Sequence, residues 1–282
     1  MFRRPGRGDW FEQQAADWRR LSLPSGDALM AADLRDLLHV KQGRSIVRHR
    51  VRTGSKIQSI FLKRHYRSSW LAGLAASVIP TGNWSDARCE ASHLQWAHDN
   101  GFRVPRVVAV GQKSGPGLKL QGYLALEELA GMMALHEAIP RAARTLPPMQ
   151  FQKWKRGLTR ALAAVVARLH GLRHFHKDLY LCHFFVPDQA ISAEPQSWDR
   201  LTMIDLHRLG HHPWAAAWWR LKDLAQLMYS SDIEGVTARD RLRFLRCYSG
   251  AGRRSSLLRW FVGIRWRNYQ RHNQRRVAGR AA

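Results

Sequence analysis

The sequence predicts an α+β protein with two lobes, the first built on a small antiparallel sheet and the second mostly helical. Three observations predict this class. The chain has 282 residues, which is enough for two lobes with a sizeable core. Stretches rich in Val, Ile and Phe, bounded by turn residues, occupy the first half, whereas apolar residues at helical spacing dominate the second. The pattern changes from strand-like to helical near Gly131, which we take as the boundary between the lobes. We therefore divide the chain into a basic, helical N-terminal extension (1–40), an N-lobe (41–130), a C-lobe (131–250) and an Arg-rich C-terminal helix or tail (251–282).

The first lobe is predicted from alternating strand and helix signals. Apolar residues at helical spacing over 27–40 predict a helix that Gly43 ends. Three stretches of strand character follow it: 45–49, 51–52 and 56–63. A helix over 85–100 comes next, and two further strands lie on either side of a Gly/Lys turn. The second of these strands ends in the paired carboxylates of Glu127 and Glu128.

The second lobe is predicted to be mostly helical. Residues 151–171 carry Leu and Val at helical spacing, and residues 214–229 and the C-terminal region show the same pattern. A short polar segment, 176–183, follows the first of these helices, and a short apolar strand after it ends in Asp205. Polar loops between helices are therefore the places where we expect chemistry.

Charge is the outlying feature of the composition. Lys and Arg number 46 against 21 Asp and Glu, so the net charge is +25 and the sequence pI is about 11.3. Residues 241–282 hold twelve arginines and no acid, interleaved with aromatic residues. Nucleic acid, anionic lipid and phosphorylated glycan all fit this composition, so a polyanionic partner is expected.

The composition also predicts the compartment. The three cysteines are few and unclustered, which favours a reducing environment. The N-terminal MFRRPGRGDW is basic but no apolar region follows it, so a secretory signal is not expected. The longest apolar runs, 70–79 and 213–219, are shorter than the ~18–20 residues that span a bilayer. We therefore predict a cytoplasmic protein.

The most concentrated group of reactive side chains is His176-Lys177-Asp178, directly after the long helix, with His176 and Asp178 as candidate catalytic groups. Asp205 stands at the end of a strand, a common position for a metal ligand. Lys63 lies inside an apolar strand, where its charge is costly unless an anion meets it, and the next helix supplies Glu90. Together with the acidic pair before Gly131, these residues stand in the order that kinases use.

The longest of these motifs resemble one family. FHKDLYLCHFF, TMIDLHRLG and WWRLKDLAQLMYSS are similar to the lipopolysaccharide kinase family, which phosphorylates inner-core Kdo or heptose. The resemblance also covers FLKRHY, the helix with its following strand, LALEEL and RFLRCYSG, and it extends over residues 43–250 with the order intact. It implies a protein-kinase-like two-lobed fold that transfers the γ-phosphoryl group of ATP to a sugar hydroxyl.

The resemblance also implies residue roles. Lys63 would hold the α- and β-phosphates and pair with Glu90, and Asp178 would orient the acceptor hydroxyl and accept its proton. Asp205 would bind Mg²⁺. The backbone of Glu127, Glu128 and Leu129 would contact adenine.

The same resemblance places Asp223 beneath the catalytic loop as structural support. Two departures from the protein-kinase pattern affect the remaining ligands. His183 stands where protein kinases have a metal-binding Asn, and imidazole is a poor ligand for Mg²⁺, so the number of metal ions stays open. Gly43 is the only glycine of a possible phosphate loop, where G-x-G-x-x-G would be usual.

Simpler interpretations exist for each residue alone. The HKD segment is also compatible with a turn capped by its Asp, Lys63 with an edge-strand lysine and Glu90 with a solvated helix residue. The histidines at 170, 174 and 176 suggest zinc, but no Cys or carboxylate completes a ligand set. Cys182 is typical of a small buried residue. Only the order of the motifs argues against these alternatives.

The partners follow from charge and resemblance together. We expect a lipid-linked core oligosaccharide as acceptor and an anionic membrane surface, reached from the cytoplasmic side, with nucleic acid disfavoured. The segment 255–271 predicts either an interfacial helix or a final C-lobe helix. Two other functions stay open: a kinase-like enzyme with a small-molecule or protein acceptor, and an inactive kinase-like scaffold that binds anionic membrane or nucleic acid.

Overall fold

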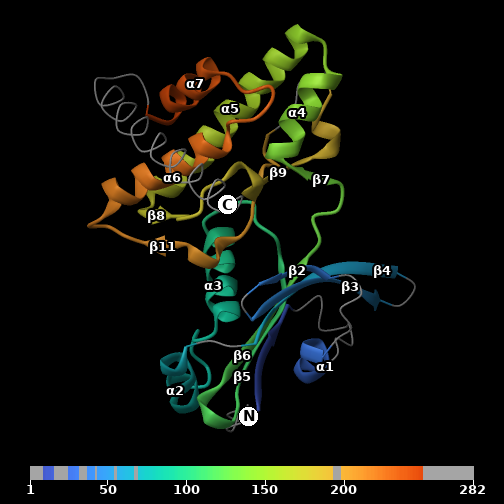
Figure 1. The fold of residues 1–282 in the computed structure, drawn as a ribbon, viewed down its shortest axis with the longest axis vertical. Helices are drawn as coiled ribbons and strands as arrows, with labels where there is room; N and C mark the ends of the chain where they lie inside the picture. The colour runs from blue at the N-terminus through green and yellow to red at the C-terminus, as the bar shows by residue number, and fades with distance from the viewer. Residues whose placement is uncertain are drawn as a thin grey trace, which may run out of the picture. The chain divides into compact units, whose positions relative to one another are not determined.

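The computed structural model divides the chain into two compact units. Unit 1 comprises residues 1–130 and unit 2 comprises residues 131–282. The structure describes residues 9–15, 25–31, 37–41, 43–53, 56–66, 69–192 and 198–249. The C-terminal helix or tail expected over 251–282 therefore lies outside the described residues. An antiparallel sheet precedes a mostly helical unit (Figure 1), so the predicted α+β class is confirmed.

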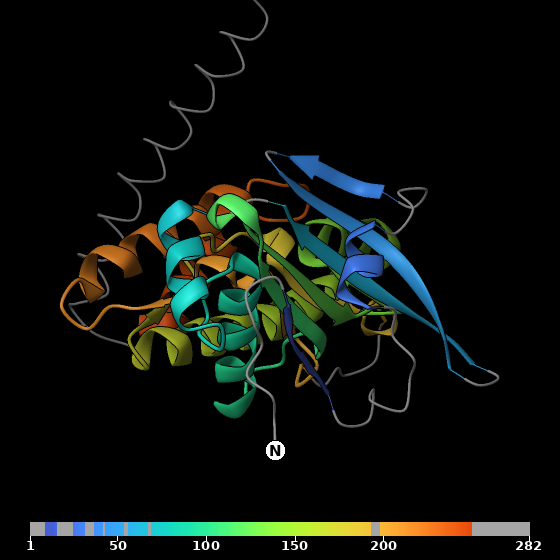
Figure 2. The ribbon, with the colours of Figure 1, turned by 90° about the horizontal axis from the view of Figure 1, so that it is seen from below.

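Unit 1 is built on one six-stranded antiparallel sheet in the order β1-β5-β6-β4-β3-β2. Its strands are β1 (Trp10–Gln14), β2 (Leu37–Lys41), β3 (Arg44–Thr53), β4 (Lys56–His65), β5 (Val107–Ser114) and β6 (Leu120–Glu127). Figure 2 shows the twist that right-handed strands impose on such a sheet. The strands predicted in the first lobe are therefore confirmed, and β3 and β4 are longer than their apolar stretches.

Helices cover both faces of this sheet. The helices of unit 1 are α1 (Gly26–Ala31), α2 (Trp70–Val78) and α3 (Asp86–Asp99). Successive residues of β4 point to opposite faces: Leu62 joins the core with Leu29 of α1, and Lys63 reaches α3. Figure 1 shows α1 and α3 on opposite sides of the sheet. This alternation puts Lys63 on the α3 face.

The helix expected over 27–40 is wrong at residues 37–40, which form a strand. Residues 37–41 form β2, which pairs with β3, so Leu37, Leu38 and Val40 belong to a hairpin. Gly43 turns this hairpin with a φ of 78°, a conformation that costs glycine little. Strand pairing thus overrides a pattern that fitted a helix. The extension assigned to 1–40 also contributes β1, which pairs with β5 along five residues.

The described part of unit 2 contains four α-helices with short strands and turns between them. The elements are β7 (Met132–Ala134), α4 (Leu135–Thr145), α5 (Pro148–Gly171), β8 (His174–Phe175), η2 (Leu181–His183), β9 (Phe184–Pro187), η3 (Asp188–Ala190), β10 (Thr202–Met203), η4 (Leu206–Arg208), β11 (Gly210–His211), α6 (Ala216–Ser230) and α7 (Ala238–Ser249). Among the described residues, no helix is long and apolar enough to cross a membrane.

Helix α5 forms the centre of unit 2. Leu158, Leu162 and Val166 on its buried face are at most 6% exposed. Lys155 on the same helix forms a buried ion pair with Asp240 of α7 at 2.7 Å and also donates to the Gly235 carbonyl. A buried charge pair of this kind is costly to break, because removal of one partner leaves the other unpaired. The helix thus provides a rigid base for the loop that follows it.

Candidate functional site

The loop predicted to carry chemistry, residues 176–183, begins with a completely buried histidine. His176 is 0% exposed, and burial lowers the pKa of its imidazole, so the ring is neutral at physiological pH. Its Nε2–H donates to the Ile204 carbonyl at 3.0 Å. His176 therefore ties this loop to the segment that carries Asp205, and its ring has no access to a solvent-borne ligand.

Asp223 on α6 holds the same loop from the inside of unit 2. Its two carboxylate oxygens accept hydrogen bonds from the backbone N–H groups of His176 and Lys177, each at 2.8 Å. Lys177 has a φ of 66°, which is unfavourable for a residue with a side chain. The second bond therefore holds a strained residue in place immediately before Asp178.

The network beneath Asp223 extends to α5 and α7. Burial lowers the pKa of His170 and raises that of Tyr248, so His170 is neutral and Tyr248 is protonated. The Tyr248 hydroxyl then donates to Nδ1 of His170 at 2.8 Å, and the His170 Nε2–H donates to Asp223 at 3.2 Å. Three helices are thereby connected to the loop.

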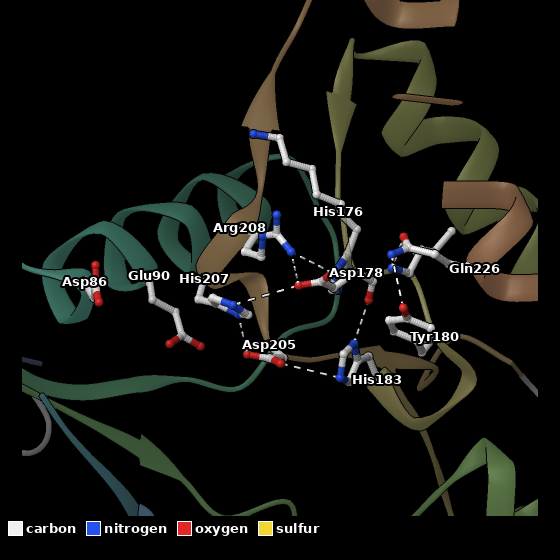
Figure 3. Close-up of polar contacts among 12 residues, drawn as sticks. Asp86, Glu90, His176, Asp178, Tyr180, His183, Asp205, His207, Arg208 and Gln226 are labelled. Atoms are coloured by element: carbon white, nitrogen blue, oxygen red, sulfur yellow. Dashed lines mark hydrogen bonds and ion pairs between the residues drawn. The ribbon is translucent and has the colours of Figure 1, made fainter. Parts of the chain in front are cut away.

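The side chain of Asp178 points towards Arg208 and His207 (Figure 3). Arg208 of η4 donates to both of its oxygens, at 3.1 and 3.2 Å. Nε2 of His207 lies 3.9 Å from the same carboxylate. The Asp178 backbone carbonyl accepts a hydrogen bond from Nδ1 of His183 at 2.7 Å. The carboxylate thus has a fixed orientation on a rigid loop and stays partly exposed.

Asp205 lies beside Asp178 in unit 2 and is held by two histidines (Figure 3). Nδ1 of His207 lies 2.8 Å from one oxygen, and Nε2 of His183 lies 3.4 Å from the other. Asp205 has a φ of 61°. Burial alone would lower the pKa of His183, but the neighbouring Cys182 and Asp205 raise it above its ordinary value. A proton on Nε2 then faces the Asp205 carboxylate.

These side chains fit a nucleotide-bound Mg²⁺ better than a structural metal site. No group of three or more potential ligands among the described residues is arranged to hold a metal ion on its own. Mg²⁺ keeps several waters and binds through one or two carboxylates plus substrate phosphates. The Asp205 carboxylate, which is 31% exposed, suits that requirement. A structural zinc site needs a complete set of protein ligands, and the residues that the structure describes contain no such group.

Unit 1 holds the predicted lysine and glutamate together. Nζ of Lys63 on β4 lies 2.6 Å from Oε1 of Glu90 on α3. The glutamate side chain is 2% exposed, whereas the lysine side chain is 17% exposed. The pair therefore neutralises a buried carboxylate and leaves the ammonium group accessible from one side. The alternative of a solvated Glu90 is wrong.

The backbone at the end of β6 offers fewer contacts than the sequence suggested. The N–H of Glu127 donates to Arg106 and that of Glu128 to Ser59. The Glu128 side chain binds Arg48. Within the described part of the chain, no hydrogen bond uses the N–H of Leu129, which is the one donor of the three left for a ligand.

Gly43 is the turn residue between β2 and β3, and its carbonyl accepts from the Tyr66 N–H at 2.9 Å. Close packing would not exclude a side chain at this position, because nothing lies within 4 Å of the place a Cβ would take. The positive φ alone explains the glycine.

Two residues of the site escaped the sequence analysis. The motifs give no role to His207 or Arg208, although Arg208 binds both oxygens of Asp178. The signal that could have found them is their position, because these two basic residues lie within three residues of the candidate metal ligand Asp205.

Comparisons with known proteins place this geometry in context. The sequence model described as "Lipopolysaccharide kinase (Kdo/WaaP) family" matches residues 41–248. The "Lipopolysaccharide core heptose(I) kinase WaaP" of Pseudomonas aeruginosa is 33% identical over 205 residues, which are 71% of this chain and 73% of that protein. A protein of the same name from Escherichia coli is 31% identical over 144 residues, about half of either chain. A solved structure described as "WaaP in complex with acyl carrier protein" matches with a TM-score of 0.65 and 27% identity, covering 92% of this chain and 99% of that one.

Proposed function

The chain belongs to the lipopolysaccharide kinase (Kdo/WaaP) family, and from this premise we propose that it transfers the γ-phosphoryl group of ATP to a heptose hydroxyl of the lipopolysaccharide inner core. As a member of this family it is a phosphotransferase that acts on a sugar hydroxyl and uses ATP. The curated relatives described above are heptose(I) kinases, which favours heptose over Kdo. The observation that carries the proposal is the partly exposed Asp178 carboxylate on a loop fixed by Asp223.

Asp178 is assigned the role of binding the acceptor hydroxyl. Phosphoryl transfer has a loose transition state, so an enzyme gains most from positioning the hydroxyl and from placing charge around the phosphate. A carboxylate within hydrogen-bond distance of the hydroxyl orients it and takes its proton. Arg208 and the loop hold Asp178 for this task, and His176 acts as a positioning residue because its ring is fully buried.

Asp205 is assigned to Mg²⁺, which would neutralise developing charge on the phosphates. His183 and His207 are positioning residues for this carboxylate. Because Nδ1 of His183 donates to the Asp178 carbonyl, His183 connects the two aspartates instead of supplying a second metal ligand. In unit 1, Lys63 is assigned to the ATP phosphates and the Leu129 N–H to the adenine.

An anionic acceptor is supported by a cluster of cations next to Asp178. The ammonium groups of Lys177 and Lys222 lie 5.0 and 4.9 Å from the Trp219 ring centroid, and the His212 ring stacks on the same indole. Burial lowers the pKa of Lys177, and the charges of Arg208 and Lys222 lower it further. A bound anion would offset the mutual repulsion of these charges. A carboxylate or phosphate of a core glycan is such an anion.

The partners follow from the same family. The solved relative is in complex with acyl carrier protein, and we extend this partner to the present chain. A lipid-linked acceptor also places the enzyme at the periphery of the cytoplasmic membrane, where its charge of +25 favours anionic lipid.

The acceptor is tested by transfer of label from γ-labelled ATP, in the presence of Mg²⁺, to two purified lipopolysaccharides. One contains unphosphorylated inner-core heptose, and the other ends at Kdo. We expect label in the heptose-containing acceptor alone, measured on the isolated glycan.

Label in the Kdo-terminated acceptor would instead make the protein a Kdo kinase. Label in neither acceptor, with folded protein and intact ATP, would favour the inactive scaffold. Label in an added protein or small alcohol would favour the other enzyme class.

A separate prediction concerns the Lys63–Glu90 pair. Lys63→Met removes the charge assigned to the phosphates, so we expect kcat/KM for ATP to fall by about 10²-fold or more. It also leaves the buried Glu90 unpaired, which is expected to lower the free energy of unfolding by about 1–3 kcal/mol. Steady-state kinetics and denaturant unfolding measure the two effects.

The double variant Lys63→Met/Glu90→Leu separates chemistry from stability. It removes both charges, so stability should return towards the wild-type value while activity stays low. Recovery of activity in the double variant would contradict a phosphate-binding role for Lys63.

A further inference from the structure

Helix α2 has the reverse of the usual surface-helix pattern. Its buried positions are the small residues Gly73 and Ala76. Its exposed positions are large and apolar: Trp70 (66%), Leu71 (59%), Leu74 (44%), Val78 (73%) and the following Ile79 (52%). These are five of the ten large hydrophobic side chains exposed among the described residues. A soluble helix normally buries its large apolar side chains, so this one presents them to something else.

The inward face of α2 is committed to close packing and cannot simply rotate to bury the large residues. A Cβ at Gly73 would lie 1.8 Å from the carbonyl oxygen of Leu118. Leu118 itself has a φ of 59°, which is costly for leucine. The sheet side of the helix therefore fits only small residues, and the outward direction of Trp70, Leu74 and Val78 follows from this packing.

The outward residues form one continuous stripe. At 100° per residue, Trp70, Leu71, Leu74 and Val78 fall within an arc of about 100°. The helix is fixed at both ends, because the Ser69 hydroxyl accepts from the Ala72 N–H and the Trp84 indole donates to the Ile79 carbonyl at 2.8 Å. Residues 70–79 contain no charged side chain. The stripe is thus a preformed apolar surface and not a frayed segment.

We propose that α2 is a membrane-docking helix that lies in the interface of an anionic bilayer with its Trp70–Val78 stripe inserted among the acyl chains. Charge supports this occupant: residues 70–79 hold no acid that would repel an anionic surface, and the chain as a whole carries +25. A bilayer also makes no demand for hydrogen-bond complementarity, and the stripe offers only the indole N–H, a group common at membrane interfaces.

The proposal rests on the proposed function, because a lipid-linked acceptor requires the enzyme to work at a membrane surface. In this arrangement α2 contributes the insertion of apolar side chains into the bilayer. The net positive charge of the chain contributes the attraction to anionic lipid. Neither contribution alone anchors a protein strongly, and the combination gives reversible binding.

The test is co-sedimentation of the full chain with vesicles of phosphatidylethanolamine and phosphatidylglycerol, at low and high salt. The variant Leu71→Ser/Val78→Ser removes two residues of the stripe. The matched control, Met149→Ser/Leu242→Ser, removes two exposed apolar residues of unit 2. We expect the α2 variant to bind about tenfold more weakly, and to lose the fraction that survives high salt in the wild type, whereas the control binds as the wild type does.

Phosphoryl transfer to a soluble, delipidated core oligosaccharide distinguishes failure of this proposal from failure of the proposed function. The α2 variant should retain wild-type activity on the soluble acceptor and lose activity on the vesicle-embedded one. Wild-type vesicle binding by the α2 variant would overturn the proposal, as would equal loss in the control. Self-association or capture of another segment of this chain that depends on Leu71 and Val78, without vesicle binding, would also overturn it. Absence of transfer to both acceptors by the wild type would count against the proposed function alone.

Discussion

Replacing Asp178 by Asn is expected to lower the turnover number of phosphoryl transfer by about 10²–10⁴-fold and to leave ATP binding nearly unchanged. The amide keeps the size of the side chain but cannot take the proton of the acceptor hydroxyl. It also presents one oxygen where the carboxylate presents two, so the Arg208 nitrogen that now contacts both oxygens, at 3.1 and 3.2 Å, would contact only one. Transfer of labelled phosphate and equilibrium binding of ATP measure the two quantities.

The control for this variant is Asp188→Asn, which makes the same chemical change in unit 2 outside the loop. It should match the wild type in both measurements. Arg208→Gln adds a second comparison: if Arg208 only orients Asp178, its loss should lower turnover without a change in the KM for ATP. An Asp178→Asn enzyme that works at the wild-type rate would remove the assignment of Asp178 to the acceptor hydroxyl.

The elements that could be predicted from the sequence are those with a long, consistent period. Helices α3 and α5 extend over Asp86–Asp99 and Pro148–Gly171, within a few residues of their predicted ranges. Strands β5 and β6 were also found, because each is a continuous apolar run bounded by turn residues. In these segments the local preference for helix or strand agrees with the tertiary packing, so one sequence is sufficient to predict the element.

Other elements depend on contacts that no local pattern contains. Residues 37–41 are strand because β3 pairs with them, although their spacing also fits a helix. Helix α2 has apolar residues on every side, so it has no polar face from which a helical period could be read. Strands such as β8 and β10 are two residues long, which is too short for any periodicity.

In the candidate site too, some features could be predicted from local patterns and others depend on long-range contacts. Single residues in recognisable positions, such as Lys63, Asp178 and Asp205, could be named from motifs. The contacts that hold them could not, because Arg208 meets Asp178 across thirty positions of chain and Tyr248 reaches Asp223 only through His170. Such contacts are properties of the folded core. They decide how rigid a named residue is, and rigidity is what phosphoryl transfer requires of it.

Replacing Asp223 by Ala is therefore expected to have the largest effect on stability. The change removes the acceptor for three donors: the buried N–H of His176 and Nε2–H of His170, and the partly buried N–H of Lys177. Unsatisfied buried donors of this kind, and the loss of a buried charge from a network, cost about 3–5 kcal/mol in free energy of unfolding. Thermal melting and denaturant unfolding of the purified chain measure the loss.

The same replacement should also abolish transfer at temperatures where the variant is still folded, because the bond from Asp223 to the Lys177 N–H holds a residue with a φ of 66° directly before Asp178. Asp223→Asn keeps one oxygen and should retain one of the two backbone bonds, so its stability and turnover should fall between those of the wild type and Asp223→Ala. Its KM for ATP should not change, since Asp223 touches no part of the nucleotide site proposed in unit 1. An Asp223→Asn chain with wild-type melting temperature and turnover would mean that the loop keeps its conformation without this carboxylate, and the positioning role would be lost.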